Sequence, residues 1–127
     1  MTIREDARRI IDTSIRAVLP DAAVQRALEG FTPPAGRLVL VALGKAAWQM
    51  AAAAADCLGD AVSDGVVITK YGHAKGDIPH VRIREAGHPV PDQNSFDATA
   101  EAVSLVEPLG AQDGVLLLIS GGGSALF

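Results

Sequence analysis

The alternation of apolar and polar positions divides the chain into four apolar segments separated by stretches of helical periodicity. Residues 38–43 and 115–119 are continuous apolar runs and 65–69 is a shorter one, as expected of strands buried on both faces. Residues 81–86 alternate instead, which predicts a half-exposed or edge strand. Because helical patterns lie between most of these strands, the sequence predicts an α/β fold: an open, mainly parallel sheet with helices on both faces, in a Rossmann-like three-layer arrangement.

Four helices are expected around this sheet. The first runs from Ile3 towards Pro20 behind a Thr2–Glu5 capping box, and its single apolar stripe is typical of a helix that packs on a core. The others are predicted from apolar spacing and stop signals at residues 21–29, at 46–58 before Gly59, and from Asn94 or Ser95 to Glu107.

Composition narrows the class of protein. The 127 residues are 49% apolar and 20% charged, which suits one globular domain and is too little for two ordinary ones. A net charge of −4 and an aromatic content of 4% argue against nucleic-acid and anionic-membrane binding. The single cysteine excludes an intrachain disulfide, and no apolar run approaches the ~20 residues that span a bilayer. The mixed-charge N-terminus resembles neither a signal nor a transit peptide, so a cytoplasmic location is expected.

Residues capable of chemistry follow each predicted strand, at the carboxyl ends where open parallel sheets bind their ligands. These loops are Gly44-Lys45, Lys70-Tyr71-Gly72-His73, Gly87-His88-Pro89 and Ser120 to Ser124. All three lysines lie between positions 45 and 75, and all three histidines between 73 and 88. In an acidic protein this predicts a cationic rim, and it favours an anionic small molecule over a polymer as the ligand.

Lys45 and the glycine-rich loop are the sharpest candidates for anion binding. Lys45 stands at a predicted helix start, where the helix dipole disfavours a cation unless an anion binds beside it; a solvated lysine is the alternative. In Ser120, Gly121, Gly122, Gly123 and Ser124, backbone N–H groups can converge on an anion and two hydroxyls can add donors. A tight turn is the alternative, although it accounts less well for three glycines. The Walker A, dinucleotide Gly-x-Gly-x-x-Gly and Gly-x-Ser-x-Gly patterns are absent.

The remaining polar residues give weaker indications. The histidines lack flanking residues that would complete a metal site, so no metal ligand is predicted from them. Asp92 and Asp77 could assist a magnesium ion bound through phosphate. The proline-braced segment from His88 to Asp92 can position a polar group, with a structural turn as the alternative. We therefore treat Lys70, His88 and Asp92 as supporting residues of the predicted site.

Four motifs then occur in order along the chain. They are Leu-Gly-Lys-Ala-Ala (43–47), Val-Ile-Thr-Lys-Tyr-Gly-His (67–73), Glu-Ala-Gly-His-Pro-Val-Pro-Asp (85–92) and Leu-Ile-Ser-Gly-Gly-Gly-Ser-Ala-Leu (118–126). Together they resemble the MOFRL-associated glycerate 2-kinase family, many of whose members are labelled hydroxypyruvate reductase. The resemblance implies ATP-dependent phosphorylation of D-glycerate to 2-phosphoglycerate with a divalent metal, expected to be Mg²⁺. It also implies that Lys45 is the active-site lysine and that residues 120–124 form the anion loop.

Family members are considerably longer than this chain. Residues 1–127 are therefore expected to be the N-terminal part of the family's larger domain, without its remainder or the second domain, and to be inactive alone. Two other functions stay open: an NAD(P)H-dependent hydroxypyruvate reductase and a non-catalytic module that binds a phosphorylated metabolite. The reductase is disfavoured by the missing dinucleotide pattern and by Lys70, which stands where an acidic residue would end the second strand. A homo-oligomer is also left open.

Overall fold

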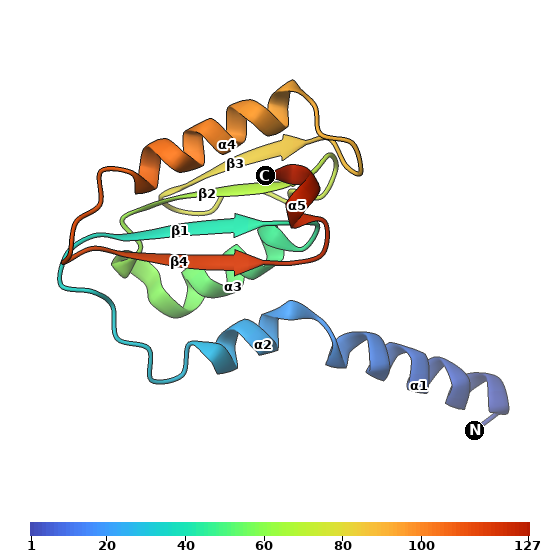
Figure 1. Ribbon diagram of the computed structural model, residues 1–127. Coiled ribbons are helices and arrows are strands. Elements are labelled where there is room, and N and C mark those ends of the chain that lie inside the picture. The colour runs from blue at the N-terminus through green and yellow to red at the C-terminus, as the bar shows by residue number, and fades with distance from the viewer.

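The computed structural model describes residues 1–127 and places a four-stranded parallel sheet between two layers of helices (Figure 1). The strands lie side by side in the order β3-β2-β1-β4. This arrangement confirms the predicted three-layer α/β fold, and each predicted strand differs from the observed one by at most one residue at either end. The elements are α1 (Ile3–Ala17), α2 (Pro20–Ala27), β1 (Leu38–Leu43), α3 (Ala47–Leu58), the 3-10 turn η1 (Gly59–Ala61), β2 (Asp64–Lys70), β3 (Val81–Ala86), α4 (Gln93–Val106), β4 (Gly114–Ile119) and α5 (Gly123–Leu126).

The central strands β1 and β2 are buried on both faces, and their side chains point alternately into two apolar clusters. Leu40, Ala42 and Val67 pack with α2 and α3 on one face. Val41 and Ile68 pack with α4 and α5 on the other. Ala47, Ala51, Ala53 and Ala54 of α3 are almost fully buried against the sheet, so small side chains let that helix lie close to the strands. The carboxyl ends of β1 and β2 are thereby held in fixed positions.

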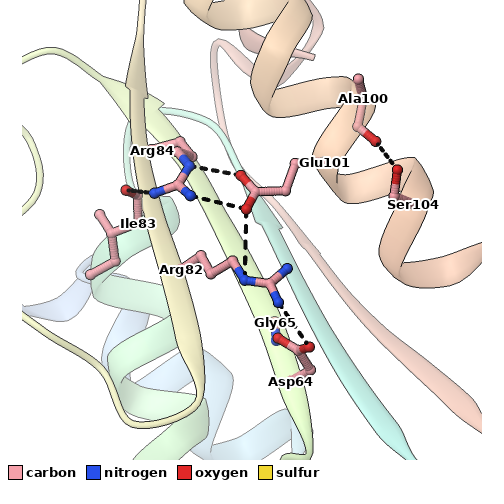
Figure 2. Close-up of polar contacts among 8 residues, drawn as sticks. All are labelled: Asp64, Gly65, Arg82, Ile83, Arg84, Ala100, Glu101 and Ser104. Atoms are coloured by element: carbon pink, nitrogen blue, oxygen red, sulfur yellow. Dashed lines mark hydrogen bonds and ion pairs between the residues drawn. The ribbon is translucent and has the colours of Figure 1, made fainter.

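The edge strand β3 carries charged side chains that pair with α4 and β2, as its alternating pattern predicts. Arg84 donates from Nε and Nη2 to the carboxylate of Glu101 at 2.7 and 3.0 Å (Figure 2). Arg82 forms ion pairs with Asp64 at 3.3 Å and with Glu101 at 3.7 Å. Both arginines of this edge are thus neutralised by carboxylates, and α4 is tied to the sheet.

The other edge strand, β4, departs from the prediction of a strand buried on both faces. Val115, Leu117 and Ile119 point to the α4 side of the sheet and are 46%, 52% and 60% exposed. The reason is the strand order: α4 lies over β2 and β3, so its cover does not extend to β4 (Figure 1). The apolar composition of β4 correctly predicted a strand, but it did not predict its position at an edge.

The first helix also differs from expectation. The Thr2–Glu5 capping box is present, and α1 forms where predicted. However, α1 has no buried residue, Ile3 is 90% exposed, and the helix projects away from the sheet (Figure 1). The expectation that it packs on the core is therefore wrong, because no other element of this chain lies against its apolar stripe. No helix of the chain combines the length and apolar character needed to cross a membrane.

Candidate functional site

The turn between β1 and α3 is joined directly to the glycine-rich loop that follows β4. Gly44 adopts a φ of +117°, and a Cβ added there would lie 2.6 Å from the carbonyl oxygen of Ser120. The Lys45 amide donates to the Gly121 carbonyl at 2.9 Å, and the Ala46 amide donates to Ser120 Oγ at 3.0 Å. Because β1 and β4 are neighbours in the sheet, these two loops form one unit, and it requires glycine at position 44.

The backbone of Lys45 is fixed from a second side by residues at the end of β2. Its carbonyl oxygen lies 3.1 Å from His73 Nδ1 and accepts a hydrogen bond from Thr69 Oγ1 at 3.4 Å. Since a carbonyl can only accept, His73 Nδ1 carries the hydrogen in this contact. Thr69 is fully buried. Lys45 is therefore held in place by its main chain, while its side chain remains exposed.

The loop of residues 71–76 is pinned next to Lys45 by two side chains. Glu85, near the end of β3, accepts from the amides of His73 at 3.1 Å and Ala74 at 3.3 Å. Trp48 of α3 donates from Nε1 to the Gly76 carbonyl at 2.8 Å. The loop and the first turn of α3 enclose a cleft of about 280 Å³, lined by Lys45, Ala46, Gln49, Gly72, His73 and Lys75.

The glycine-rich loop presents unused backbone donors beside the Lys45 side chain. The amides of Gly121, Gly122 and Ser124 donate to no backbone or side-chain acceptor in the chain. Gly122 has a φ of +90°, and a Cβ added there would lie 2.7 Å from His88 Nε2 and 3.3 Å from Lys45 Cγ. His88 and Lys45 therefore flank the backbone at Gly122 closely. The predicted site residues Lys45, His88 and 121–124 come together at one end of the sheet.

Ser120 has its hydroxyl engaged within the chain. Ser120 Oγ accepts from the Ala46 amide and donates to the Leu43 carbonyl at 3.4 Å. Its hydroxyl fixes the turn before α3, so the free donors of the loop are main-chain amides together with the exposed Ser124 hydroxyl.

Asp92 holds the loop that carries His88 instead of pointing to an open site. It is the N-cap of α4 and accepts from the Ser95 amide at 3.1 Å, while Ser95 Oγ accepts from the Asp92 amide at 3.0 Å. Capping by Asn94 or Ser95, expected from the sequence, is therefore wrong by two or three positions. Tyr71 donates to Asp92 Oδ2 at 2.6 Å, and Asn94 donates to the Tyr71 hydroxyl at 2.8 Å.

These hydrogen bonds determine the acidity of Asp92. The Tyr71 hydroxyl, followed by the Gly87 and Ser95 amides, stabilises the carboxylate and holds the pKa of Asp92 below its ordinary value. The same contact raises the pKa of Tyr71. A carboxylate with lowered pKa stabilises the fold above about pH 4, and this contribution is lost as the pH falls through the pKa of the folded state.

We expect Tyr71→Phe to raise the pKa of Asp92 towards its ordinary value, because the largest stabilising contact of the carboxylate is removed. The free energy of unfolding at neutral pH should be lower in this variant than in the wild type. The additional decrease on acidification should be smaller than in the wild type, because less of the stability depends on the charged carboxylate. A carbon-13 NMR titration of the Asp92 carboxyl measures this shift. Asp113 is an internal reference, since its lowered pKa arises from the Gly110 and Arg37 amides, far from Tyr71 along the chain. An unchanged Asp92, or an equal shift of Asp113, would contradict the assignment.

The lysines differ from the arginines in their surroundings. No lysine of the chain has a carboxylate oxygen within 4.0 Å, whereas the β3 arginines are paired (Figure 2). Lys45 and Lys75 line the same cleft. By strand alternation Lys70 lies with Ile68 on the α4 side of the sheet, away from that cleft. His80 precedes β3 and so lies at the amino ends of the strands. The prediction that it belongs to a cationic rim at the carboxyl ends is therefore wrong.

Known proteins resemble this chain over nearly its whole length. Residues 6–127 match a family described as a domain of unknown function, DUF4147. The D-glycerate 2-kinase of Thermotoga maritima is 48% identical over 126 residues, which cover 99% of this chain and 30% of that protein. The glycerate 2-kinase of Pyrococcus horikoshii is 40% identical, over 100% of this chain and 30% of that protein. The crystal structure of glycerate kinase from Thermotoga maritima is similar with a TM-score of 0.87 and 50% identity, over 95% of this chain and 29% of that one. The chain thus spans about 30% of the length of these relatives.

Proposed function

This chain belongs to the DUF4147 family, and from that membership we propose that it contributes the phosphate-binding part of the active site of an ATP-dependent D-glycerate 2-kinase. The reaction transfers the terminal phosphoryl group of ATP to the 2-hydroxyl of D-glycerate and yields 2-phosphoglycerate and ADP. The names of two relatives at 48% and 40% identity support this assignment.

The observation that carries the proposal is the position of Lys45 beside three unbonded amides. Phosphoryl transfer relies on positioning and on compensation of negative charge more than on covalent chemistry. The amides of Gly121, Gly122 and Ser124 bind phosphate oxygens, and the Lys45 side chain runs past Gly121 and Gly122. The glycines allow this approach, because at Gly122 a Cβ would contact both His88 and Lys45.

In this reaction the residues of the chain stabilise negative charge on the phosphoryl group and hold Lys45 in position. As the substrate hydroxyl attacks the transferred phosphorus, negative charge grows on the oxygens around it, and Lys45 stabilises that charge. His73 and Thr69 hold the Lys45 backbone, and Ser120 fixes the adjoining turn. Because these contacts involve main-chain atoms, the lysine side chain is free to adjust to the substrate.

The residues present form no protein cage for a magnesium ion. No group of three or more His, Cys, Asp or Glu side chains is placed to hold one. Asp92, one of the two carboxylates that the sequence offered together with Asp77, is occupied by Tyr71 and Ser95. A Mg²⁺ ion that accompanies ATP would be held mainly by phosphate oxygens and water with one or two carboxylates, and these residues form no carboxylate cluster of their own for it. We expect the chain alone to be inactive.

A coupled assay of the full-length protein, in which ADP release is linked to NADH oxidation, tests the proposal. We expect ADP release that depends on D-glycerate, with 2-phosphoglycerate as the product identified by mass spectrometry. A parallel assay with hydroxypyruvate and NAD(P)H, without ATP, addresses the reductase. Hydride transfer without kinase activity would overturn the proposal in favour of the reductase, and binding without turnover would favour a binding module.

The same assay on the 127-residue chain tests whether it acts alone. We expect no glycerate-dependent ADP release above background, because the chain supplies cations and amides but no metal-binding carboxylate cluster. Release at an ordinary enzymatic rate, on the order of 1–10³ per second, would contradict this expectation.

A further inference from the structure

The geometry points to a second anion subsite, distinct from the glycine-rich loop: we propose that the cleft between the first turn of α3 and the loop of residues 71–76 binds the carboxylate of the hydroxy-acid substrate, with Lys75 as its principal ligand. This inference rests on the proposed function for the identity of the acid. It assigns a specificity-determining role to a residue that takes no part in the phosphate-binding loop.

Charge is the first observation in its favour. Lys45 and Lys75 line the cleft together, and neither lies within 4.0 Å of a carboxylate. No acidic side chain lines the cleft. The chain has 15 acidic residues against 11 basic ones, so two unpaired cations facing one cavity are not a consequence of composition. An anion bound in the cleft is attracted by the positive charge of both lysines.

The cleft is also rigidly built. Glu85 holds the amides of His73 and Ala74 from behind the loop, and Trp48 holds the Gly76 carbonyl. Gln49, in the cleft wall, donates its side-chain amide to Asp21 at 2.6 Å. The loop that carries Lys75 is therefore tied at three of its residues before any ligand arrives, which reduces the entropy lost on binding.

His73 gives the cleft a means of recognising a hydroxyl group. Its Nδ1 faces the Lys45 carbonyl and so carries the hydrogen, which leaves Nε2 of the neutral ring as an acceptor. His73 itself lines the cleft. Cations for a carboxylate and an acceptor for a hydroxyl are the complement of a hydroxy acid.

Size favours a small acid over a nucleotide. A volume of about 280 Å³ is just below the ~300–1,000 Å³ typical of pockets for drug-sized ligands. Lys45 borders both this cleft and the glycine-rich loop. With the acid in the cleft and phosphate on the loop, the hydroxyl and the transferred phosphoryl group meet at Lys45.

The test compares Lys75→Ala and Lys75→Gln with the wild type in the full-length protein. We expect the KM for D-glycerate to rise about 10- to 100-fold, as for loss of a charge-assisted hydrogen bond, while the KM for ATP stays within about twofold. The matched control is Arg26→Ala, which removes an exposed cation on α2 and should change neither constant. A rise in the KM for ATP with that for glycerate unchanged would overturn the proposal by assigning the cleft to nucleotide phosphates, and unchanged values for both would overturn it outright.

A binding measurement without ATP separates this inference from the proposed function. Trp48 is the only tryptophan of these 127 residues and contacts the loop, so its fluorescence, taken as the difference from a Trp48→Phe variant, reports both loop attachment in the variants and binding of D-glycerate. We expect wild-type emission in unliganded Lys75→Gln and a dissociation constant for D-glycerate raised by the same factor as the KM. If Lys75→Gln weakens D-glycerate binding but the wild type shows no kinase activity, the carboxylate subsite is supported and the proposed kinase function is rejected. If the wild type is a kinase but Lys75→Gln binds D-glycerate as tightly as the wild type, the kinase function is supported and the subsite is rejected.

Discussion

In the full-length protein, Lys45→Ala is expected to lower kcat by about 10²- to 10³-fold, the cost of removing one charge that stabilises a transition state in a preorganised site. The side chain borders both the glycine-rich loop with its unbonded amides and the cleft, and no carboxylate oxygen lies within 4.0 Å of it. The loss should appear in kcat more than in the KM for ATP, because the stabilised charge develops during transfer. Steady-state kinetics with both substrates varied measures the effect.

We expect Lys45→Ala to leave the stability of the fold nearly unchanged. The Lys45 side chain is exposed, and every hydrogen bond of the residue involves its main chain, so the free energy of unfolding should change by less than about 1 kcal/mol. The Arg26→Ala variant again controls for loss of a surface cation. A variant that loses only substrate affinity, with kcat intact, would contradict a catalytic role and favour the binding-module alternative.

Gly44→Ala is expected to have the largest effect on stability, about 3 kcal/mol or more. A φ of +117° costs a non-glycine residue on the order of 1–3 kcal/mol, and the added Cβ would meet the Ser120 carbonyl at 2.6 Å. That carbonyl belongs to the backbone, so relief requires β4 and its loop to move away from β1. Urea denaturation measures the loss, and the kinase activity that we propose should fall with it because the glycine-rich loop is displaced from Lys45.

Gly30→Ala is the matched comparison. Gly30 also has a positive φ, +73°, but a Cβ there meets no atom within 4 Å. Its cost should therefore be confined to backbone strain, about 1–2 kcal/mol. Equal losses in the two variants would show that the contact between the β1 turn and Ser120 does not contribute.

Local sequence patterns predicted the elements of the fold but not all of their surroundings. Continuous apolar runs located β1 and β2, because the apolar side chains that favour a strand are also the ones that the two helical layers bury. The run 115–119 was read in the same way, yet β4 lies at an edge, and an edge is a property of strand order that no local pattern contains. Likewise, the stripe of α1 predicted a helix but could not reveal that nothing lies against it.

For the site, sequence reasoning identified the residues with obvious chemistry and missed those that hold them. Lys45 and the glycine-rich loop follow adjacent strands, so their proximity was foreseeable from the sheet. Trp48 and Glu85 were missed because their roles are hydrogen bonds to backbone atoms 28 and 12 residues away along the chain. Thr69 offered a signal, since it is the polar residue at the end of an otherwise apolar buried strand.

The two edge strands, β3 and β4, differ in how readily a further strand could pair with them. Along β3, two arginines held by carboxylates would place charge against any strand that approached, and such edges resist pairing. Along β4 the outer backbone groups are unpaired, and the side chains alternate between exposed and half-buried apolar residues with no charge among them. Addition of a further strand is therefore favoured at β4 and disfavoured at β3.

When the 127 residues are produced alone, aggregation should start at β4, and the substitution Leu117→Lys should suppress it.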